Sequence, residues 1–131
     1  MQKPIIKLDE PRAKSIKFTS DLFDRGIIWD RFPYGVYIDA LYPREGCFVE
    51  AVEAFFGEID RVHLRFRYTA PHLPMELYLI KRGYKRYVDA PGTPFYTNTF
   101  IPKSCVEAPR TAEEIETLER IMLQSGNEYA V

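Results

Sequence analysis

The strongest constraint on the fold is a ten-residue stretch, residues 59–68, in which apolar and polar side chains alternate. In its second half, which ends at Tyr68, the residues between the apolar positions are all basic: His63, Arg65 and Arg67. A period of two residues is typical of a strand that buries one of its faces. The stretch therefore predicts a strand with one apolar face and one basic face.

The residues that follow this strand change to helical spacing. Apolar side chains recur through residues 73–80, Pro74 fits the first turn of a helix, and Gly83 favours its end. Residues 85–89 then resume the pattern of a strand. Strand, loop, helix and strand are therefore expected in direct succession, as in an α/β protein.

A second strand is predicted at residues 34–42. We expect two faces, one formed by Val36, Ile38 and Ala40 and the other by Tyr37, Asp39 and Leu41. Asp39 is unusual there, because a carboxylate inside a strand has to be solvated or paired. If the basic strand is its neighbour, an ion pair inside the domain is the structural interpretation of Asp39.

A turn at residues 43–46 leads from this strand into a predicted helix. Apolar side chains at helical spacing cover residues 48–56, and we expect the helix to end at Gly57. Cys47 stands at its start.

The N-terminal third of the chain carries weaker patterns. Short strands are predicted at residues 4–8 and 15–19. A helical turn is predicted at residues 21–24, where Ser20 would form the N-cap and Gly26 the end.

The C-terminal third has clearer signals. Residues 91–94 form a turn between residues 85–89 and a β-rich run at residues 95–101, which predicts a hairpin. Thr111 and Glu114 have the spacing of a capping box, and an apolar stripe follows, so a helix is predicted at residues 110–126.

Composition limits the class of protein. A chain of 131 residues with 46% apolar residues fits one globular domain, and a net charge of -1 favours neither nucleic acid nor an anionic membrane as partner. Cys47 and Cys105 lie far apart and lack the spacing of a zinc site, so no metal is expected. We expect a cytoplasmic protein, because no signal peptide or membrane-spanning run is apparent.

The sequence resembles a known superfamily over residues 34–101. Residues 77–84, Leu-Tyr-x-x-x-x-Gly-Tyr after a strand and a loop, resemble the last conserved block of the GNAT (GCN5-related N-acetyltransferase) superfamily, and residues 34–56 are similar to its preceding block. The resemblance implies a reduced GNAT-like α/β domain, with a mixed central sheet flanked by helices. Residues 1–33 would be its variable N-terminal part, and the C-terminal helix would lie outside it. In size the chain is similar to short phage-encoded members.

This resemblance implies an acyl-CoA-dependent N-acyltransferase with acetyl-CoA as cofactor and an unknown acceptor. The acyl-CoA would lie between the two predicted strands, with Asp39 as general base and Tyr78 as general acid. The implied cofactor-binding residues are Leu41, Tyr42, Arg44, Gly46, Cys47 and Thr69. The turn departs from the family's pyrophosphate loop, because it has a single glycine and Glu45 would oppose a phosphate.

A second function stays open, that of a non-catalytic GNAT-fold protein. A phage-encoded protein of this kind would act by binding a partner protein or as a virion component, and it would reside in the host cytoplasm or in the virion. His63, Arg65 and Arg67 would then bind an acidic partner, since only 33 residues precede the first of the two strands and leave little chain to cover this face. The alternative is that these basic residues pair inside the domain. The C-terminal helix would dock on the domain or on a second subunit.

Overall fold

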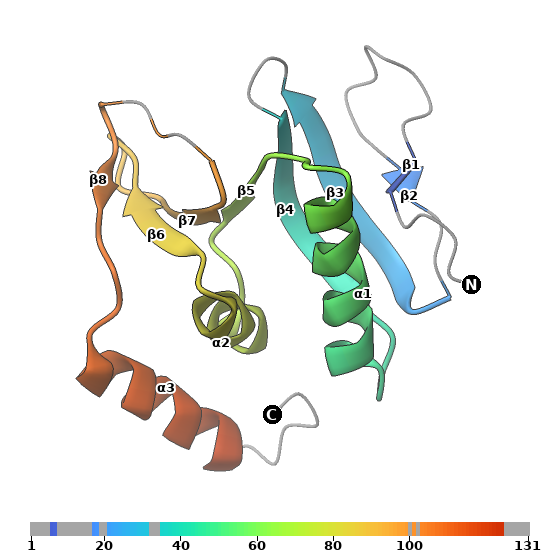
Figure 1. The fold of residues 1–131 in the computed structure, drawn as a ribbon. Coiled ribbons are helices and arrows are strands. Elements are labelled where there is room, and N and C mark those ends of the chain that lie inside the picture. The colour runs from blue at the N-terminus through green and yellow to red at the C-terminus, as the bar shows by residue number, and fades with distance from the viewer. Residues whose placement is uncertain are drawn as a thin grey trace. The chain divides into compact units, whose positions relative to one another are not determined.

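The computed structural model describes residues 6–7, 17–18, 21–31, 35–99, 101 and 103–124. It is an α/β protein with a six-stranded mixed sheet and three helices, the last of them C-terminal (Figure 1), as expected at this level. The elements are β1 (Ile6–Lys7), β2 (Lys17–Phe18), β3 (Phe23–Arg31), β4 (Gly35–Pro43), α1 (Phe48–Arg61), β5 (Phe66–Thr69), α2 (Leu73–Arg82), β6 (Lys85–Val88), β7 (Pro94–Thr97), β8 (Val106–Glu107) and α3 (Ala112–Gln124).

The strands of the sheet follow the order β3-β4-β5-β7-β6-β8. The two predicted strands that flank the first helix, now β4 and β5, are therefore neighbours, as expected. The chain divides into two compact units, Met1–Arg67 and Tyr68–Val131, and the boundary falls within β5. None of the described helices is long and apolar enough to cross a membrane.

In the first unit, two pairs of antiparallel strands precede α1. β1 pairs with β2, which confirms the two short strands predicted near the N-terminus. β3 pairs with β4 from Phe23 opposite Pro43 to Arg31 opposite Gly35. The helical turn predicted at residues 21–24 is therefore wrong, and Gly26 lies inside β3. The pairing with β4 outweighs the local turn signal.

A β-bulge at Asp39 divides β4. Ile27 lies opposite Ala40 and Ile28 opposite Ile38, so the register between β3 and β4 skips Asp39. Val36 and Ile38 are buried before the bulge, and Leu41 and Pro43 are buried after it. The predicted two faces of the strand are thus wrong beyond Ile38, because the extra residue moves Leu41 from the face of Tyr37 to the buried one.

Helix α1 extends beyond its predicted end at Gly57. Ile59 continues the buried stripe of Val52, Phe55 and Phe56, and Gly57 lies on the exposed side of the helix. An ion pair between Glu58 and Arg61, one turn apart, supports the extension. The helix thus takes up the first residues of the strand predicted at residues 59–68.

The chain then turns at Val62 and His63, where His63 has a positive φ of 55°, and β5 begins only at Phe66. The prediction of a strand was therefore wrong for residues 59–65 and correct for its last three residues.

An aromatic cluster packs the elements of the first unit together. The ring of Phe55 lies 5.8 Å from that of Phe23 on β3 and 5.1 Å from that of Phe56, both edge to face. Phe56 in turn lies 5.4 Å from Phe66 on β5. Each such pair adds about 0.5–1.5 kcal/mol to the energy of burial alone. The cluster thus packs α1 against β3 and β5.

The second unit contains the elements that the sequence predicted best. α2 has Pro74 in its first turn and ends at Gly83, whose φ is 92°. β6 and β7 form the predicted antiparallel hairpin, from Lys85 opposite Thr97 to Val88 opposite Pro94. β7 ends at Thr97, four residues earlier than predicted.

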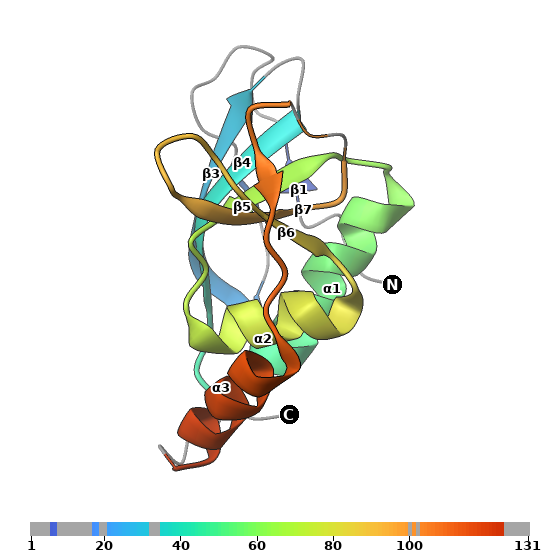
Figure 2. The same cartoon turned by 90° about the vertical axis from the view of Figure 1, so that its left-hand side faces the viewer.

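The C-terminal helix α3 is confirmed together with its capping box. The backbone N–H of Thr111 donates to Glu114 Oε1 over 2.9 Å, and the N–H of Glu114 donates to Thr111 Oγ1 over 3.1 Å. α3 lies beside α2 in both views (Figures 1 and 2), and Lys81 Nζ lies 3.7 Å from Glu119 Oε2. The short strand β8, which sequence reasoning missed, pairs with β6 ahead of this helix.

Gly35 provides a test of the junction between β4 and β5. Its φ is +109°, and a Cβ there would overlap the backbone oxygen of Arg65, which also accepts the N–H of Val36 over 2.9 Å. We expect Gly35→Ala to lower the free energy of unfolding by about 2 kcal/mol or more, measured by urea denaturation.

The matched control is Gly57→Ala. Gly57 is exposed inside α1, and a Cβ there meets no neighbouring atom within 4 Å. The free energy of unfolding of this variant should be about 1 kcal/mol higher than that of the wild type, because alanine favours a helix more than glycine does. A Gly35→Ala protein as stable as the wild type would contradict the described approach of the two strands.

Candidate functional site

The turn between β4 and α1 presents backbone amides at a helix N-terminus. A hydrogen bond from Cys47 N to Arg44 O over 2.9 Å closes the turn, and another from Arg44 N to Leu22 O over 2.8 Å joins it to the residue before β3. Cys47 is the N-cap of α1, and no side chain caps the helix. The first amides of α1 therefore lie at the positive end of the helix dipole, and the N-cap side chain accepts no hydrogen bond from them.

The charges around these amides have both signs. Arg44 is exposed, and its Nε lies 3.7 Å from Asp24 Oδ1, an ion pair that water screens on both sides. Glu45 is exposed beside it, and Glu50 lies in the first turn of α1. The amides and Arg44 would thus stabilise a bound anion, whereas the two glutamates would repel it.

The other residues implied for the cofactor lie in different surroundings. Leu41 is buried, so only its backbone could meet a ligand, whereas Tyr42 is 40% exposed. Cys47 is half-buried with a free thiol, and Gly46 is exposed in the turn with a φ of +81°. Thr69 is the last residue of β5 and belongs to the second unit.

Asp39, the implied general base, is exposed at the bulge of β4. Tyr37 lies two residues before it, and its hydroxyl accepts a hydrogen bond from Arg67 Nη1 over 3.3 Å. The guanidinium of Arg67 also lies 5.4 Å from the centre of the Tyr37 ring. Arg67 is therefore held by a cation–π contact and a hydrogen bond within the first unit.

The three basic residues do not share one strand face, so this prediction is wrong. His63 lies in the turn after α1, Arg65 precedes β5, and only Arg67 belongs to the strand. The physical reason is that α1 extends to Arg61, so the chain turns at residues that the alternating pattern had assigned to a strand. His63 and Arg65 are exposed, and Arg67 is half-buried.

Tyr78, the implied general acid, lies in the second unit on α2, with 7% of its surface exposed. Its hydroxyl accepts a hydrogen bond from Arg82 Nη1 over 2.7 Å, and Arg82 Nε donates to the hydroxyl of Tyr84 over 3.0 Å. Sequence reasoning missed Arg82, although its position four residues after Tyr78 puts both on one face of a helix.

The most densely paired group of the second unit is the carboxylate of Glu76, which sequence reasoning also missed. Glu76 Oε2 accepts hydrogen bonds from the hydroxyl of Tyr96 and from Arg110 Nε, each over 2.8 Å. Arg110 Nη2 donates to Oε1 over 3.2 Å, which completes a bidentate pair. Arg86 Nε lies 3.7 Å from Oε2.

This environment shifts the ionisation of the partners of Glu76. Burial, reinforced by the hydrogen bond to Glu76, raises the pKa of Tyr96 far above its usual range. The hydrogen bond from Arg110 to the same carboxylate raises the pKa of that guanidinium. The sequence contained one indication of the cluster, which is a lone carboxylate between Met75 and Leu77 in an otherwise apolar part of α2.

Comparisons with known proteins add no assignment. No protein-family model, curated protein or solved structure matches the chain. Within the described ranges, no group of three or more His, Cys, Asp or Glu side chains could hold a metal ion.

Two glutamates that contact the same arginine test the Glu76 cluster. Glu76 has 9% of its side chain exposed and Glu114 has 46%. Glu76→Gln should lower the free energy of unfolding by about 3–5 kcal/mol, because it leaves the largely buried Arg86 without its carboxylate and Arg110 with only the exposed Glu114. Glu114→Gln should cost less than about 1 kcal/mol. Urea unfolding at pH 7 measures both, and equal losses would refute the central role of Glu76.

Proposed function

We propose that this protein is a GNAT-like N-acyltransferase that takes its acyl group from acetyl-CoA. The observation that carries the proposal is the path from the β4 bulge at Asp39, through the turn, to the uncapped start of α1 beside Arg44. Helix N-terminal amides and a nearby cation stabilise phosphate groups. The pyrophosphate of acetyl-CoA would bind there, next to a strand that carries an exposed carboxylate.

The bulge supports the proposed role of Asp39 as general base. Bulges re-aim side chains and are frequent next to active sites. Asp39 would take the proton of an acceptor ammonium, and the neutral amine would then attack the thioester carbonyl. A C–N bond forms, the C–S bond breaks, and the thiolate of CoA leaves and takes up a proton, while the new amide nitrogen releases its surplus proton to water.

Tyr78 would supply that proton as general acid. The hydrogen bond from Arg82 uses a lone pair of the Tyr78 oxygen, so Arg82 does not compete for the proton that a general acid gives up. Since Tyr78 is buried, its ring is also part of the core. Its role in chemistry therefore has to be separated from its role in packing by a change that keeps the ring.

Binding of acetyl-CoA tests the first step. Calorimetry should detect heat on titration with acetyl-CoA, and the melting temperature should rise with the excess of cofactor over its dissociation constant. Arg44→Ala should weaken binding about tenfold by removing a phosphate contact. Arg61→Ala, an exposed change at the other end of α1, should leave the affinity unchanged. An absence of heat at millimolar acetyl-CoA would refute the proposal.

Activity tests the two implied catalytic residues. Release of CoA thiol in the presence of a panel of primary amines should fall by about 10²–10⁴ in Tyr78→Phe and in Asp39→Asn. Tyr87→Phe, a half-buried tyrosine on β6, is the matched control. Melting curves should stay close to that of the wild type. Full activity in both variants would assign Asp39 and Tyr78 to structure instead of catalysis.

The exposed Arg65 favours a second candidate function, that of a non-catalytic GNAT-fold protein that binds an acidic partner protein or serves as a phage virion component. Its backbone oxygen is fixed by Val36 N, while its side chain is exposed. The calorimetry separates the two candidates, because a folded protein that gives no heat with acetyl-CoA fits only the non-catalytic one.

A further inference from the structure

Arg82 joins two tyrosine hydroxyls at the end of α2. Its Nη1 donates to the hydroxyl of Tyr78 over 2.7 Å, and its Nε donates to the hydroxyl of Tyr84 over 3.0 Å. Its guanidinium carbon also lies 5.9 Å from the centre of the Tyr78 ring. Because two hydroxyls accept from different nitrogens of one planar group, the guanidinium is held in a fixed orientation beside Tyr78.

The end of α2 places both tyrosines within reach of Arg82. Tyr78 lies one helical turn before it, on the same face of the helix. Gly83, with a φ of 92°, then reverses the chain, and the N–H of Tyr84 donates back to Leu79 O over 3.2 Å. Glycine adopts this conformation without strain. The arrangement is therefore built from one continuous segment of the chain.

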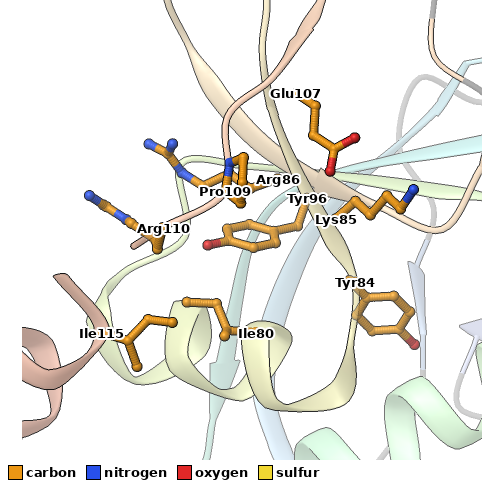
Figure 3. A pocket seen from close by; sticks show the side chains of 9 residues that line it. All are labelled: Ile80, Tyr84, Lys85, Arg86, Tyr96, Glu107, Pro109, Arg110 and Ile115. Atoms are coloured by element: carbon orange, nitrogen blue, oxygen red, sulfur yellow. The ribbon is translucent and has the colours of Figure 1, made fainter. Parts of the chain in front are cut away.

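Tyr84 also borders a pocket of about 150 Å³ among α2, the β6–β7 hairpin and the segment before α3 (Figure 3). Its hydroxyl points away from the guanidinium groups of Arg86 and Arg110, which lie on the far side of Tyr96 in this view. Those two guanidinium groups lie next to the carboxylate of Glu76. Tyr84 thus belongs with Arg82 and not with the Glu76 cluster.

The hydrogen bond from Arg82 favours the ionised form of Tyr78. A guanidinium keeps its charge in proteins, so it stabilises negative charge on the oxygen that accepts its hydrogen bond. Such charge-assisted bonds are strong, and their effect increases where little water reaches them. Only 7% of the surface of Tyr78 is exposed. A general acid at Tyr78 would become a phenolate as it gives up its proton, and Arg82 would stabilise that developing charge.

We propose that Arg82 is a positioning residue for Tyr78, which directs the hydroxyl and stabilises the phenolate formed in the proposed acyl transfer. The proton passes from the hydroxyl of Tyr78 to the thiolate sulfur of CoA, and the phenolate then takes a proton from water. The part of this inference that concerns acyl transfer rests on the proposed function. The effect of Arg82 on the ionisation of Tyr78 does not, because it depends on the contact between the two side chains.

Matched variants separate the charge of Arg82 from its bulk. Arg82→Gln removes the charge and keeps a hydrogen-bond donor, whereas Arg82→Lys keeps the charge. Lys81→Gln removes the same charge from the neighbouring position, where Lys81 Nζ contacts Glu119 on α3. Tyr84→Phe leaves Arg82 in place and removes its second acceptor.

The ionisation of Tyr78 can be measured without an assay of activity. Replacement of Tyr78 by a difluorotyrosine in the full chain provides a ¹⁹F NMR signal, and the fluorines bring the ionisation of the phenol towards neutral pH. Arg82→Gln should then raise the pH midpoint of the titration by about one unit or more. Arg82→Lys should keep most of the original midpoint, Tyr84→Phe should cause a smaller rise, and Lys81→Gln should cause none. An unchanged midpoint in a folded Arg82→Gln protein would overturn the inference, and if that variant does not fold, an unchanged midpoint in Tyr84→Phe would do so.

Activity tests the role of Arg82 in acyl transfer. In Arg82→Gln, kcat for release of CoA thiol should fall about tenfold or more, while KM and the calorimetric heat with acetyl-CoA should stay as in the wild type. Arg82→Lys should recover most of the loss. Full activity in Arg82→Gln would overturn the role in transfer. An absence of heat with acetyl-CoA would refute the proposed function instead, and the ¹⁹F titration would still decide whether Arg82 acts on Tyr78.

Discussion

The buried carboxylate of Glu76 is the interaction on which the order of the second unit depends. A carboxylate with 9% of its side chain exposed is tolerated only if donors surround it, and here they come from β7 through Tyr96 and from the segment before α3 through Arg110. Since α2 carries Glu76, three parts of the chain far apart in sequence have to meet at one charge. Replacement by an apolar residue would relieve that requirement but would leave Arg86 without its carboxylate and Arg110 with only the exposed Glu114.

In the first unit, the packing of β4 depends on a β-bulge and not on a buried charge. The bulge at Asp39 shifts the buried face of β4 by one residue, so Leu41 and Pro43 reach the core while Asp39 stays exposed. A strand without the extra residue would bury the carboxylate or expose Leu41. The strand thus keeps its apolar contacts and an exposed acid in the same element.

Local signals in the sequence predicted the elements that local chemistry determines. Thr111 and Glu114 specify the start of α3 through two mutual hydrogen bonds, and Gly83 ends α2 in a conformation that other residues avoid. These features need no information from the rest of the chain. The same holds for the β6–β7 hairpin, whose turn is closed by Asp89 through its backbone oxygen and side chain.

Two of the features that sequence reasoning missed, the bulge in β4 and the Glu76 cluster, depend on partners distant in sequence. Ile59 fits both a helical stripe and a strand alternation, and only its packing with the other buried residues of α1 decides between them. A bulge is a property of a pair of strands, so the composition of β4 alone could not reveal it. The partners of Glu76 lie 20 and 34 residues away, which no local pattern encodes.

Tyrosine hydroxyls and the buried Glu76 hold several of the arginines in the described part of the chain. Arg67 is held by Tyr37, Arg82 by Tyr78 and Tyr84, and Arg110 by Glu76. A count of basic residues along the sequence therefore overstates the charge that a partner would encounter. Arg44 and Arg65 are exposed, and Arg86 is buried beside an acid that other donors already use. Net charge supplies no general attraction for an anion, so anion recognition by the described residues depends on local groups such as Arg44 and Arg65.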